Sequence, residues 1–263
     1  MEHHYQHIQS KTNNNVLSIL LDRPLKRNAL HPAMISEIQH VLETYKDSES
    51  IRVVLISSTS SVFSAGADIK YLEKMLKFSY EENLLDSQKL MNLLKTMLSY
   101  PKLIIAKIVG PAIAGGCGLV TASDITFSEQ HSIFGYPEVK IGFVPALVSS
   151  LLMSKINGTQ MRDLLLTGKT INAQEAHSIG LINYVCDQKS INTEINTFIK
   201  KFCTETSPNS IKITKEIIYL SQNLEAKLEE AAKINAKSRM DDDFKKGVTA
   251  FLKKQTINWG KKK

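Results

Sequence analysis

Four short apolar stretches rich in β-branched residues follow one another through the first half of the chain, as buried strands do. They are residues 16–21, 51–57, 102–108 and 124–128. Between them, apolar residues recur every three to four positions over residues 31–46, where Pro32 stands early, and over residues 84–98, which predicts two helices. Strands that alternate with helices predict an α/β domain with largely parallel pairing.

The pattern changes after about Asn183, where the strand signals stop and helical stripes begin. These stripes cover residues 191–202, 224–236 and 241–254. They are too short to form a core alone, so we expect the helices to pack on the first domain or on a neighbouring subunit. Just before them, Asn172 and Glu175 have the spacing of a capping box and Gly180 that of a helix C-terminus, which predicts a short structural helix.

Composition narrows the class of protein. The 263 residues are 43% hydrophobic, enough for one large domain or for a domain with an appended lobe. No apolar run reaches the roughly 18–20 residues of a membrane span, and the first residues lack the features of a signal or transit peptide, so we expect a cytoplasmic protein. Three cysteines without a C-x-x-C pair indicate neither a disulfide framework nor a metal site.

The formal net charge of +7 indicates an anionic partner, and composition leaves open whether this is RNA or a small ligand with nucleotide phosphates. Part of the excess lies near the C-terminus, where we expect a solvated tail. The residues concerned are Lys253, Lys254, Lys261, Lys262 and Lys263. The other basic residues are scattered and have no aromatic residues between them, so nucleic acid is the less favoured partner.

Candidate chemistry begins with two loops of small residues that follow predicted strands, SVFSAGADIK at 61–70 and GPAIAGGCG at 110–118. Small residues let a ligand approach the backbone, and amides at a strand-to-helix turn point outward with the helix dipole behind them. Each loop could therefore donate an N–H to an oxyanion, or its glycines could simply allow tight turns. Neither loop has the spacing of a dinucleotide fingerprint or a P-loop, and no G-x-S-x-G serine motif is present.

A third feature is Glu138 in the stretch IFGYPEVKIGFVPA at 133–146, where most of its neighbours are apolar. An apolar setting disfavours the charged form of a carboxyl group and raises its pKa, which suits general acid–base catalysis near neutral pH. The alternative is a glutamate that caps the following helix or pairs with Lys140.

Sequence motifs of one enzyme family occur along nearly the whole chain, in that family's order and at its spacing. They are LDRPLKRNAL at 21–30, FSAGADIK at 63–70, GPAIAGGCGLV at 110–120, FGYPEVKIG at 134–142 and LTGKTINAQEAHSIGLINYV at 166–185. The chain thus resembles the crotonase family of enoyl-CoA hydratases and isomerases. The resemblance implies an α/β fold, the crotonase (ClpP-like) spiral of ββα repeats, at residues 1–200 and a C-terminal α-helical trimerisation lobe at residues 201–263. It also implies an acyl-CoA thioester as substrate, no further cofactor, and assembly as a homotrimer or homohexamer.

The resemblance assigns roles to single residues. The amides of Ala67 and Gly115 match the family's oxyanion donors, which hold the thioester oxygen as it becomes an enolate, and Glu138 matches its acid–base glutamate. The family's CoA contacts fall on the first loop and on the basic LKR turn. They match Lys26, Arg27, Ala65, Ile69 and Lys70. No metal ligand is implied.

One position departs from the family pattern. Hydratases with two catalytic glutamates carry the second one where this chain has Gly118. Isomerases of the family use a single glutamate, so the activity stays open between an enoyl-CoA hydratase, our leading hypothesis, and an enoyl-CoA isomerase or decarboxylase. A protein that binds RNA on a crotonase scaffold is the alternative from another class.

The sequence says less about the acyl group of the substrate than about the thioester. The stretches GGCGLVTASDI and FGYPEVKIGFVPALVSS look similar to a bacterial branch of methylglutaconyl-CoA and related branched-chain enoyl-CoA hydratases. In this family residues 71–98 are expected to line the acyl pocket, and Met75, Leu76 and Phe78 indicate an apolar tail. We therefore expect short or branched acyl chains.

Overall fold

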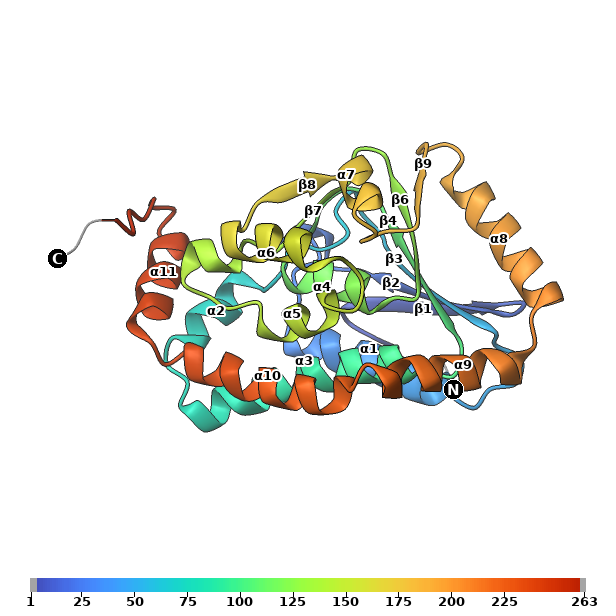
Figure 1. The fold of residues 1–263 in the computed structure, drawn as a ribbon, viewed down its shortest axis with the longest axis horizontal. Helices are drawn as coiled ribbons and strands as arrows, with labels where there is room; N and C mark the ends of the chain where they lie inside the picture. Colours follow the sequence, from blue (N-terminus) through green and yellow to red (C-terminus); the bar gives the residue numbers. More distant parts are fainter. Residues whose placement is uncertain (1–3, 261–263) are drawn as a thin grey trace.

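The computed structural model describes residues 4–260, and within them nine strands form two sheets (Figure 1). The large sheet has the order β1-β2-β3-β4-β6-β9 and the small sheet the order β5-β7-β8. The strands of the large sheet are β1 (Ile8–Asn13), β2 (Val16–Leu21), β3 (Val53–Ser58), β4 (Leu103–Ile108), β6 (Ile125–Glu129) and β9 (Tyr184–Cys186). Those of the small sheet are β5 (Ala112–Ile113), β7 (Ile133–Gly135) and β8 (Thr170–Asn172).

Pairing in the large sheet is parallel from β2 to β9, as the alternation of strands and helices predicts. β1 pairs with β2 in the antiparallel sense through a turn in which Asn14 has a φ of 50°. The four predicted strands are confirmed, with ends that differ by at most two residues. The expectation that no strand follows Asn183 is wrong, because β9 begins at the next residue. Its three residues are too few to show a periodic pattern.

The helices of the first part of the chain surround these sheets. They are η1 (Pro24–Lys26, 3-10), α1 (Pro32–Tyr45), α2 (Ile69–Met75), α3 (Tyr80–Ser99), α4 (Gly115–Ala122), η2 (Pro137–Ile141, 3-10), α5 (Ala146–Leu152), α6 (Gly158–Thr167) and α7 (Ala173–Ser178). The predicted capping box at α7 is confirmed, since Asn172 and Glu175 each bond the other's backbone amide. The remaining helices are α8 (Ile191–Glu205), α9 (Pro208–Ser221), α10 (Leu224–Ser238) and α11 (Asp242–Leu252).

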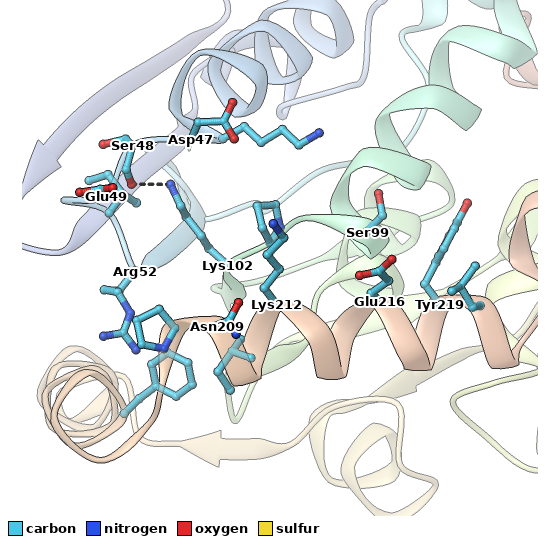
Figure 2. A pocket seen from close by; sticks show the side chains of 17 residues that line it. Asp47, Ser48, Glu49, Arg52, Ser99, Lys102, Asn209, Lys212, Glu216 and Tyr219 are labelled. Atoms are coloured by element: carbon cyan, nitrogen blue, oxygen red, sulfur yellow. Dashed lines mark hydrogen bonds between the residues drawn. The ribbon is translucent and has the colours of Figure 1, made fainter.

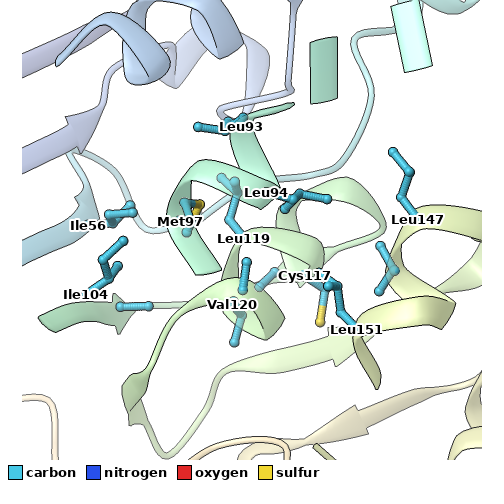
Figure 3. Packing of buried hydrophobic residues seen from close by; sticks show 14 of the residues in the cluster. Ile56, Leu93, Leu94, Met97, Ile104, Cys117, Leu119, Val120, Leu147 and Leu151 are labelled. Atoms are coloured by element: carbon cyan, nitrogen blue, oxygen red, sulfur yellow. The ribbon is translucent and has the colours of Figure 1, made fainter. Parts of the chain in front are cut away.

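Both faces of the large sheet are covered, because successive residues of its central strands point to opposite sides. In β3, Val54 and Ile56 face the main core with α1, α3 and α4, whereas Val53 faces a second cluster under α8. Figure 3 shows the main core around α4, where Leu119 and Val120 lie among residues of α3, β3, β4 and α5. This packing fixes α4, and with it the loop that precedes it.

The C-terminal helices return to the rest of the chain. α10 packs on α3 and α5, with Leu224 and Leu228 in the main core, and α11 packs on α2 and η2. For these two helices the predicted packing on the first domain is confirmed. α9 exposes Ile213, Ile217 and Leu220 instead. α8 runs across residue 200, and the division of the chain there into a core and a lobe stays a prediction.

The predicted basic tail is described only in part. Lys253 and Lys254 are exposed just after α11, whereas Lys261, Lys262 and Lys263 lie outside the described residues. No helix within residues 4–260 combines the length and the apolar character needed to cross a membrane.

Candidate active site

A cavity of ≈ 500 Å³ lies between the two loops of small residues and the C-terminal helices. Its walls are mostly apolar side chains from α1, α2, α3, η2 and α5. Ala67, Gly115 and Glu138, the three predicted catalytic residues, all line it. The fold therefore brings the two amides and the carboxyl group into one cavity, while their roles stay predictions.

The first loop leaves the Ala67 amide open. Gly66 has a φ of 90°, and its carbonyl accepts a hydrogen bond from the Leu30 amide at 2.6 Å. The Asp68 amide donates to the Leu30 carbonyl at 3.0 Å. The Ala67 amide lies between these bonded groups, and within residues 4–260 it has no hydrogen-bond partner.

The turn after β2 braces this loop through residues that sequence reasoning did not single out. Asn28 is fully buried, and its side chain donates to the Val62 carbonyl at 2.8 Å and accepts from the Arg23 amide at 2.7 Å. The Arg23 guanidinium pairs with Asp68 at 2.8 Å. Burial raises the pKa of Asp68, but hydrogen bonds from Arg23 and the Tyr71 amide outweigh it and hold that pKa below its ordinary value.

The second loop turns at Ala114, whose φ of 50° and ψ of −125° are values that residues other than glycine rarely adopt. Two bonds hold this conformation: the Ala114 amide donates to the Gly135 carbonyl at 2.8 Å, and the Gly118 amide donates to the Ala114 carbonyl at 3.0 Å. The turn leaves the Gly115 amide at the start of α4, where it has no partner in the described chain. The positive end of the helix dipole lies behind it.

The two loops touch each other. A Cβ atom at Gly116 would lie only 2.5 Å from the Cβ of Ser64, so this approach requires glycine. The Ser64 amide donates to the Pro111 carbonyl at 3.1 Å, and the Ile113 amide donates to the Ser64 carbonyl at 2.9 Å. The open amides of the two loops are thereby held in a fixed relation, which an oxyanion site requires of its donors.

Glu138 lies in η2 and is buried, and in the described chain its Oε2 atom has no hydrogen-bond partner. Burial raises its pKa to about 7. The two alternatives from the sequence do not hold: within residues 4–260 no ion pair joins Glu138 to Lys140, and no side chain caps α5. Near neutral pH this carboxyl group can both accept and release a proton.

Backbone contact with α11 holds the turn that carries Glu138. A Cβ atom at Gly247 would lie 2.1 Å from the Ile141 carbonyl oxygen. At Gly142, whose φ is +67°, a Cβ atom would lie 2.2 Å from the Asp243 carbonyl oxygen. Side chains at these positions would push the two segments apart. The C-terminal helix thus positions the carboxyl group from a distant part of the sequence.

Val148 packs closely on the position of the family's second glutamate. A Cβ atom at Gly118 would lie 3.1 Å from Cγ2 of Val148, and Val148 itself lines the cavity. Among the described residues of the lining, the carboxyl groups are those of Glu138 and Asp86, and Asp86 is paired with Arg239. Glu138 is therefore the carboxyl group available for proton transfer.

The predicted CoA contacts are divided between the cavity and its surroundings. Arg27 and Ala65 line the cavity. Lys26, Ile69 and Lys70 do not belong to its lining and are exposed, the first at the end of η1 and the other two at the start of α2. The structure thus places the first pair at the cavity and the second group at the surface of the same two segments, while their contacts with CoA stay predictions.

The wall of the predicted acyl pocket differs from the expectation. Met75 lines the cavity, whereas Leu76 and Phe78 pack in the cluster that joins α2 to α11. Sequence reasoning missed two charged residues of the wall, Asp86 on α3 and Arg239 at the end of α10. No local pattern marks them, because each is an ordinary charged residue on its own helix.

A second, more open groove of ≈ 910 Å³ lies between α9 and the turn that joins α1 to β3 (Figure 2). Lys102 lines it and donates a hydrogen bond to the Ser48 carbonyl at 2.7 Å. Neither small-residue loop contributes to this groove, and Glu138 does not line it. We therefore place the candidate active site in the smaller cavity, where the groups for catalysis are.

Known proteins resemble this chain over nearly its whole length. Residues 11–262 match the family model described as Enoyl-CoA hydratase/isomerase. A protein of Thermus thermophilus that is assigned provisionally to the enoyl-CoA hydratases is 35% identical over 243 residues, 92% of this chain and 96% of the relative. A crotonyl-CoA hydratase of Syntrophomonas wolfei is 26% identical over 97% of this chain and 98% of the relative. The crystal structure of an enoyl-CoA hydratase/isomerase from Xanthobacter autotrophicus Py2 is similar with a TM-score of 0.87 at 25% identity, covering 95% of this chain and 93% of that chain.

Proposed function

Because this chain belongs to the enoyl-CoA hydratase/isomerase family, we propose that it is an enoyl-CoA hydratase for short or branched acyl groups. One observation carries the proposal: two amides without partners in the described chain, those of Ala67 and Gly115, meet the buried carboxyl group of Glu138 in one mostly apolar cavity. A thioester conjugated to a double bond needs these two things, a site for the oxyanion and a group that moves a proton.

The proposed reaction uses Glu138 twice. The amides of Ala67 and Gly115 bind the thioester oxygen. Ionised Glu138 takes a proton from water while the water oxygen bonds to C3 of the substrate, and the electrons of the C2=C3 bond move to the thioester oxygen to form the enolate. Glu138 then delivers this proton to C2 as the thioester carbonyl forms again. One water molecule is consumed, and the carboxylate is regenerated.

Typical magnitudes support catalysis without a second glutamate. Each oxyanion donor is worth roughly 10² to 10³ in rate, and one acid–base group roughly 10² to 10⁴. The loss of one glutamate therefore need not abolish catalysis while the two donors and Glu138 remain. The raised pKa of Glu138, about 7, suits both of its steps, because the ionised and the protonated carboxyl group are both populated at neutral pH.

The CoA moiety is proposed to lie along the segments that carry Arg27 and Ala65, with Lys26, Ile69 and Lys70 at the surface beside them. The positive side chains suit the phosphates of CoA. We also propose assembly as a homotrimer or homohexamer, which the exposed apolar side chains of α9 support, and a location in the cytoplasm.

An enoyl-CoA isomerase is the second candidate, and Gly118 favours it, because this position has no carboxyl group to hold a water molecule. Glu138 would remove a proton from C2 of a 3-enoyl-CoA, the amides would hold the resulting dienolate, and the proton would return at C4. The double bond would move without addition of water. The alternative of a protein that binds RNA stays untested.

Mass spectrometry in D₂O distinguishes the candidates. Wild-type protein and Glu138→Gln are incubated with crotonyl-CoA, a 3-enoyl-CoA and 3-methylglutaconyl-CoA. A product that gains one heavy water with wild type but not with Glu138→Gln is the result expected of a hydratase. A moved double bond without added water would overturn the hydratase in favour of the isomerase. Glu129→Gln is the matched control, because Glu129 is buried but does not line the cavity.

A further inference from the structure

A cluster of polar side chains interrupts the apolar wall of the cavity at the end of α10. Arg239 is only 6% exposed, and it donates from Nη1 to Asp86 at 2.6 Å and from Nε to Asn235 at 2.9 Å. The Tyr71 hydroxyl donates to the other carboxylate oxygen of Asp86 at 2.6 Å. All four residues line the cavity. Side chains from α3 and α10 therefore bond the guanidinium directly, and Tyr71 of α2 bonds its partner Asp86.

One edge of this guanidinium is unused. Within residues 4–260 the Nη2 atom of Arg239 donates no hydrogen bond. It is also not among the polar atoms that are shut off from solvent without a partner. Arg239 is otherwise buried and lines the cavity, so we take Nη2 to be open to the cavity. The ring of Phe143, 5.1 Å from the guanidinium carbon, packs against the group and restricts its movement.

A purely structural role for Arg239, as a link between α3 and α10, does not explain why part of its guanidinium is left without an acceptor. Lys95 and Glu225 already form an ion pair between these helices, nearer the surface and outside the cavity lining. A buried ion pair costs desolvation energy unless further hydrogen bonds complete it, and an apolar contact would join the helices without that cost. Tyr71 completes the bonding of Asp86. The Nη2 donors of Arg239 are the part left incomplete, and a ligand in the cavity can supply the missing acceptor.

We propose that Arg239 determines specificity for the acyl group by binding an acceptor oxygen on the part of the acyl chain that is remote from the thioester. This inference rests on the proposed function, because it takes the amides of Ala67 and Gly115 to hold the thioester oxygen. None of the contacts of Arg239 is with the two loops that carry those amides. A chain that is anchored at the loops by its thioester can therefore present its remote end to the guanidinium.

The acceptor can be the oxygen of a hydroxyl, a carbonyl or a carboxylate group, since each accepts from an N–H donor. Arg239 and Asp86 balance each other's formal charge, so a neutral oxygen meets the donor without electrostatic opposition, whereas a carboxylate also meets the charge of Asp86. An alkyl end would remove water from Nη2 and offer no acceptor in its place. The cavity is therefore expected to discriminate against alkyl chains that lack the oxygen.

Isothermal titration calorimetry of the wild-type protein tests this inference. The ligands are saturated acyl-CoAs of about four to eight carbons, each length with a methyl, a hydroxyl and a carboxylate end. Saturated ligands cannot be hydrated, so binding is measured whether or not the protein turns over an enoyl-CoA. At one chain length or more, an oxygen-bearing ligand is expected to bind roughly 10- to 100-fold more tightly than its alkyl partner. Equal or tighter binding of the alkyl ligand at every length would overturn the inference.

Variants assign the selectivity to Arg239. In Arg239→Met the ratio of the two dissociation constants is expected to fall towards one. Because this change leaves Asp86 buried without its partner, the double variant Arg239→Met with Asp86→Asn is measured beside it. Lys95→Met is the matched control, since it breaks the other ion pair between the same helices, and it is expected to keep the wild-type ratio. A wild-type ratio in the Arg239 variants would refute the role of this residue.

The ligand panel also separates this inference from the proposed function. Selective binding together with no water addition to any enoyl-CoA would refute the hydratase and leave the specificity of Arg239 standing. Water addition without a preference for oxygen-bearing ligands would support the hydratase and refute the specificity proposed for Arg239. If neither Arg239 variant folds, the comparison of ligands on the wild-type protein decides the question alone.

Discussion

Replacement of Glu138 by glutamine is expected to remove catalysis and, at alkaline pH, to stabilise the fold. Glutamine has nearly the same shape as glutamate but cannot ionise. In the native protein the Glu138 carboxyl group is buried, and in the described chain its Oε2 atom has no partner. The substitution therefore measures what it costs the protein to hold a charge in this apolar place.

The size of the effect follows from the pKa. Burial raises the pKa of Glu138 from its ordinary 4.5 to about 7. With about 1.4 kcal/mol for each pH unit, ionised Glu138 costs the folded state roughly 3 kcal/mol. Because the pKa is raised in the folded state, the contribution of Glu138 to stability is complete below its unfolded pKa and is lost as the pH rises through the folded value. Glutamine undergoes no such loss.

Urea-induced unfolding of both proteins at about pH 5 and about pH 8.5 measures the difference. Protein concentration is held constant, because assembly would make the apparent stability depend on it. The free energy of unfolding of Glu138→Gln minus that of wild type should increase by roughly 2.5 kcal/mol between the two pH values, because at pH 5 a small part of the stabilisation by protonated Glu138 is already lost. Turnover of crotonyl-CoA by the variant should be lower by roughly 10² to 10⁴.

A difference in unfolding free energy that is the same at both pH values would refute the reasoning, since burial would then impose no penalty on the ionised carboxyl group. Undiminished turnover by the variant would exclude Glu138 as the proton carrier.

Three further predictions follow from the same geometry. First, kcat/KM of the wild type should rise with pH through about 7 as Glu138 ionises to act as a base, and a pH-rate profile without this limb would contradict that role. Second, Gly247→Ala should lower both activity and the free energy of unfolding, the latter by roughly 1–3 kcal/mol, because its Cβ atom would meet the Ile141 carbonyl; Gly158→Ala, whose Cβ atom would meet only the tip of an arginine side chain, is the control in the same assays. Third, Ala114→Gly should raise the free energy of unfolding by roughly 1 kcal/mol in urea titrations by relieving an unfavourable φ, and should lower kcat by loosening the adjacent amide.

Local patterns predicted the parts of the structure that local forces determine. The apolar runs of β2, β3, β4 and β6 are strong signals because these strands are buried, and β3 and β4 are covered on both faces. The density of small residues marked both loops at the cavity, and the apolar neighbours of Glu138 along the chain indicated its burial. Strands of two or three residues, such as β5 and β9, were not predicted, because so short a segment shows no alternation of apolar and polar residues.

Long-range contacts could not be predicted in this way. Tyr71, Asp86 and Arg239 come from three helices, and the sequence around each residue does not predict its contact with the others. The same is true of Val148, which fills the space beside Gly118. All four residues line the cavity, so motifs predicted its two loops and Glu138, whereas the rest of its wall depends on how separate helices meet.

Because the backbones of Gly247 and Ile141 are in contact, the turn around Glu138 can settle only after α11 has left the ribosome. The start of α11 follows Glu138 by about a hundred residues, which takes roughly 5 to 20 seconds of synthesis at 5–20 residues per second. Both small-residue loops precede Glu138 in the chain and are made earlier still. A nascent chain is therefore expected to form the two loops with the proposed oxyanion donors first, and to become catalytically competent only when α11 docks on the turn that carries Glu138.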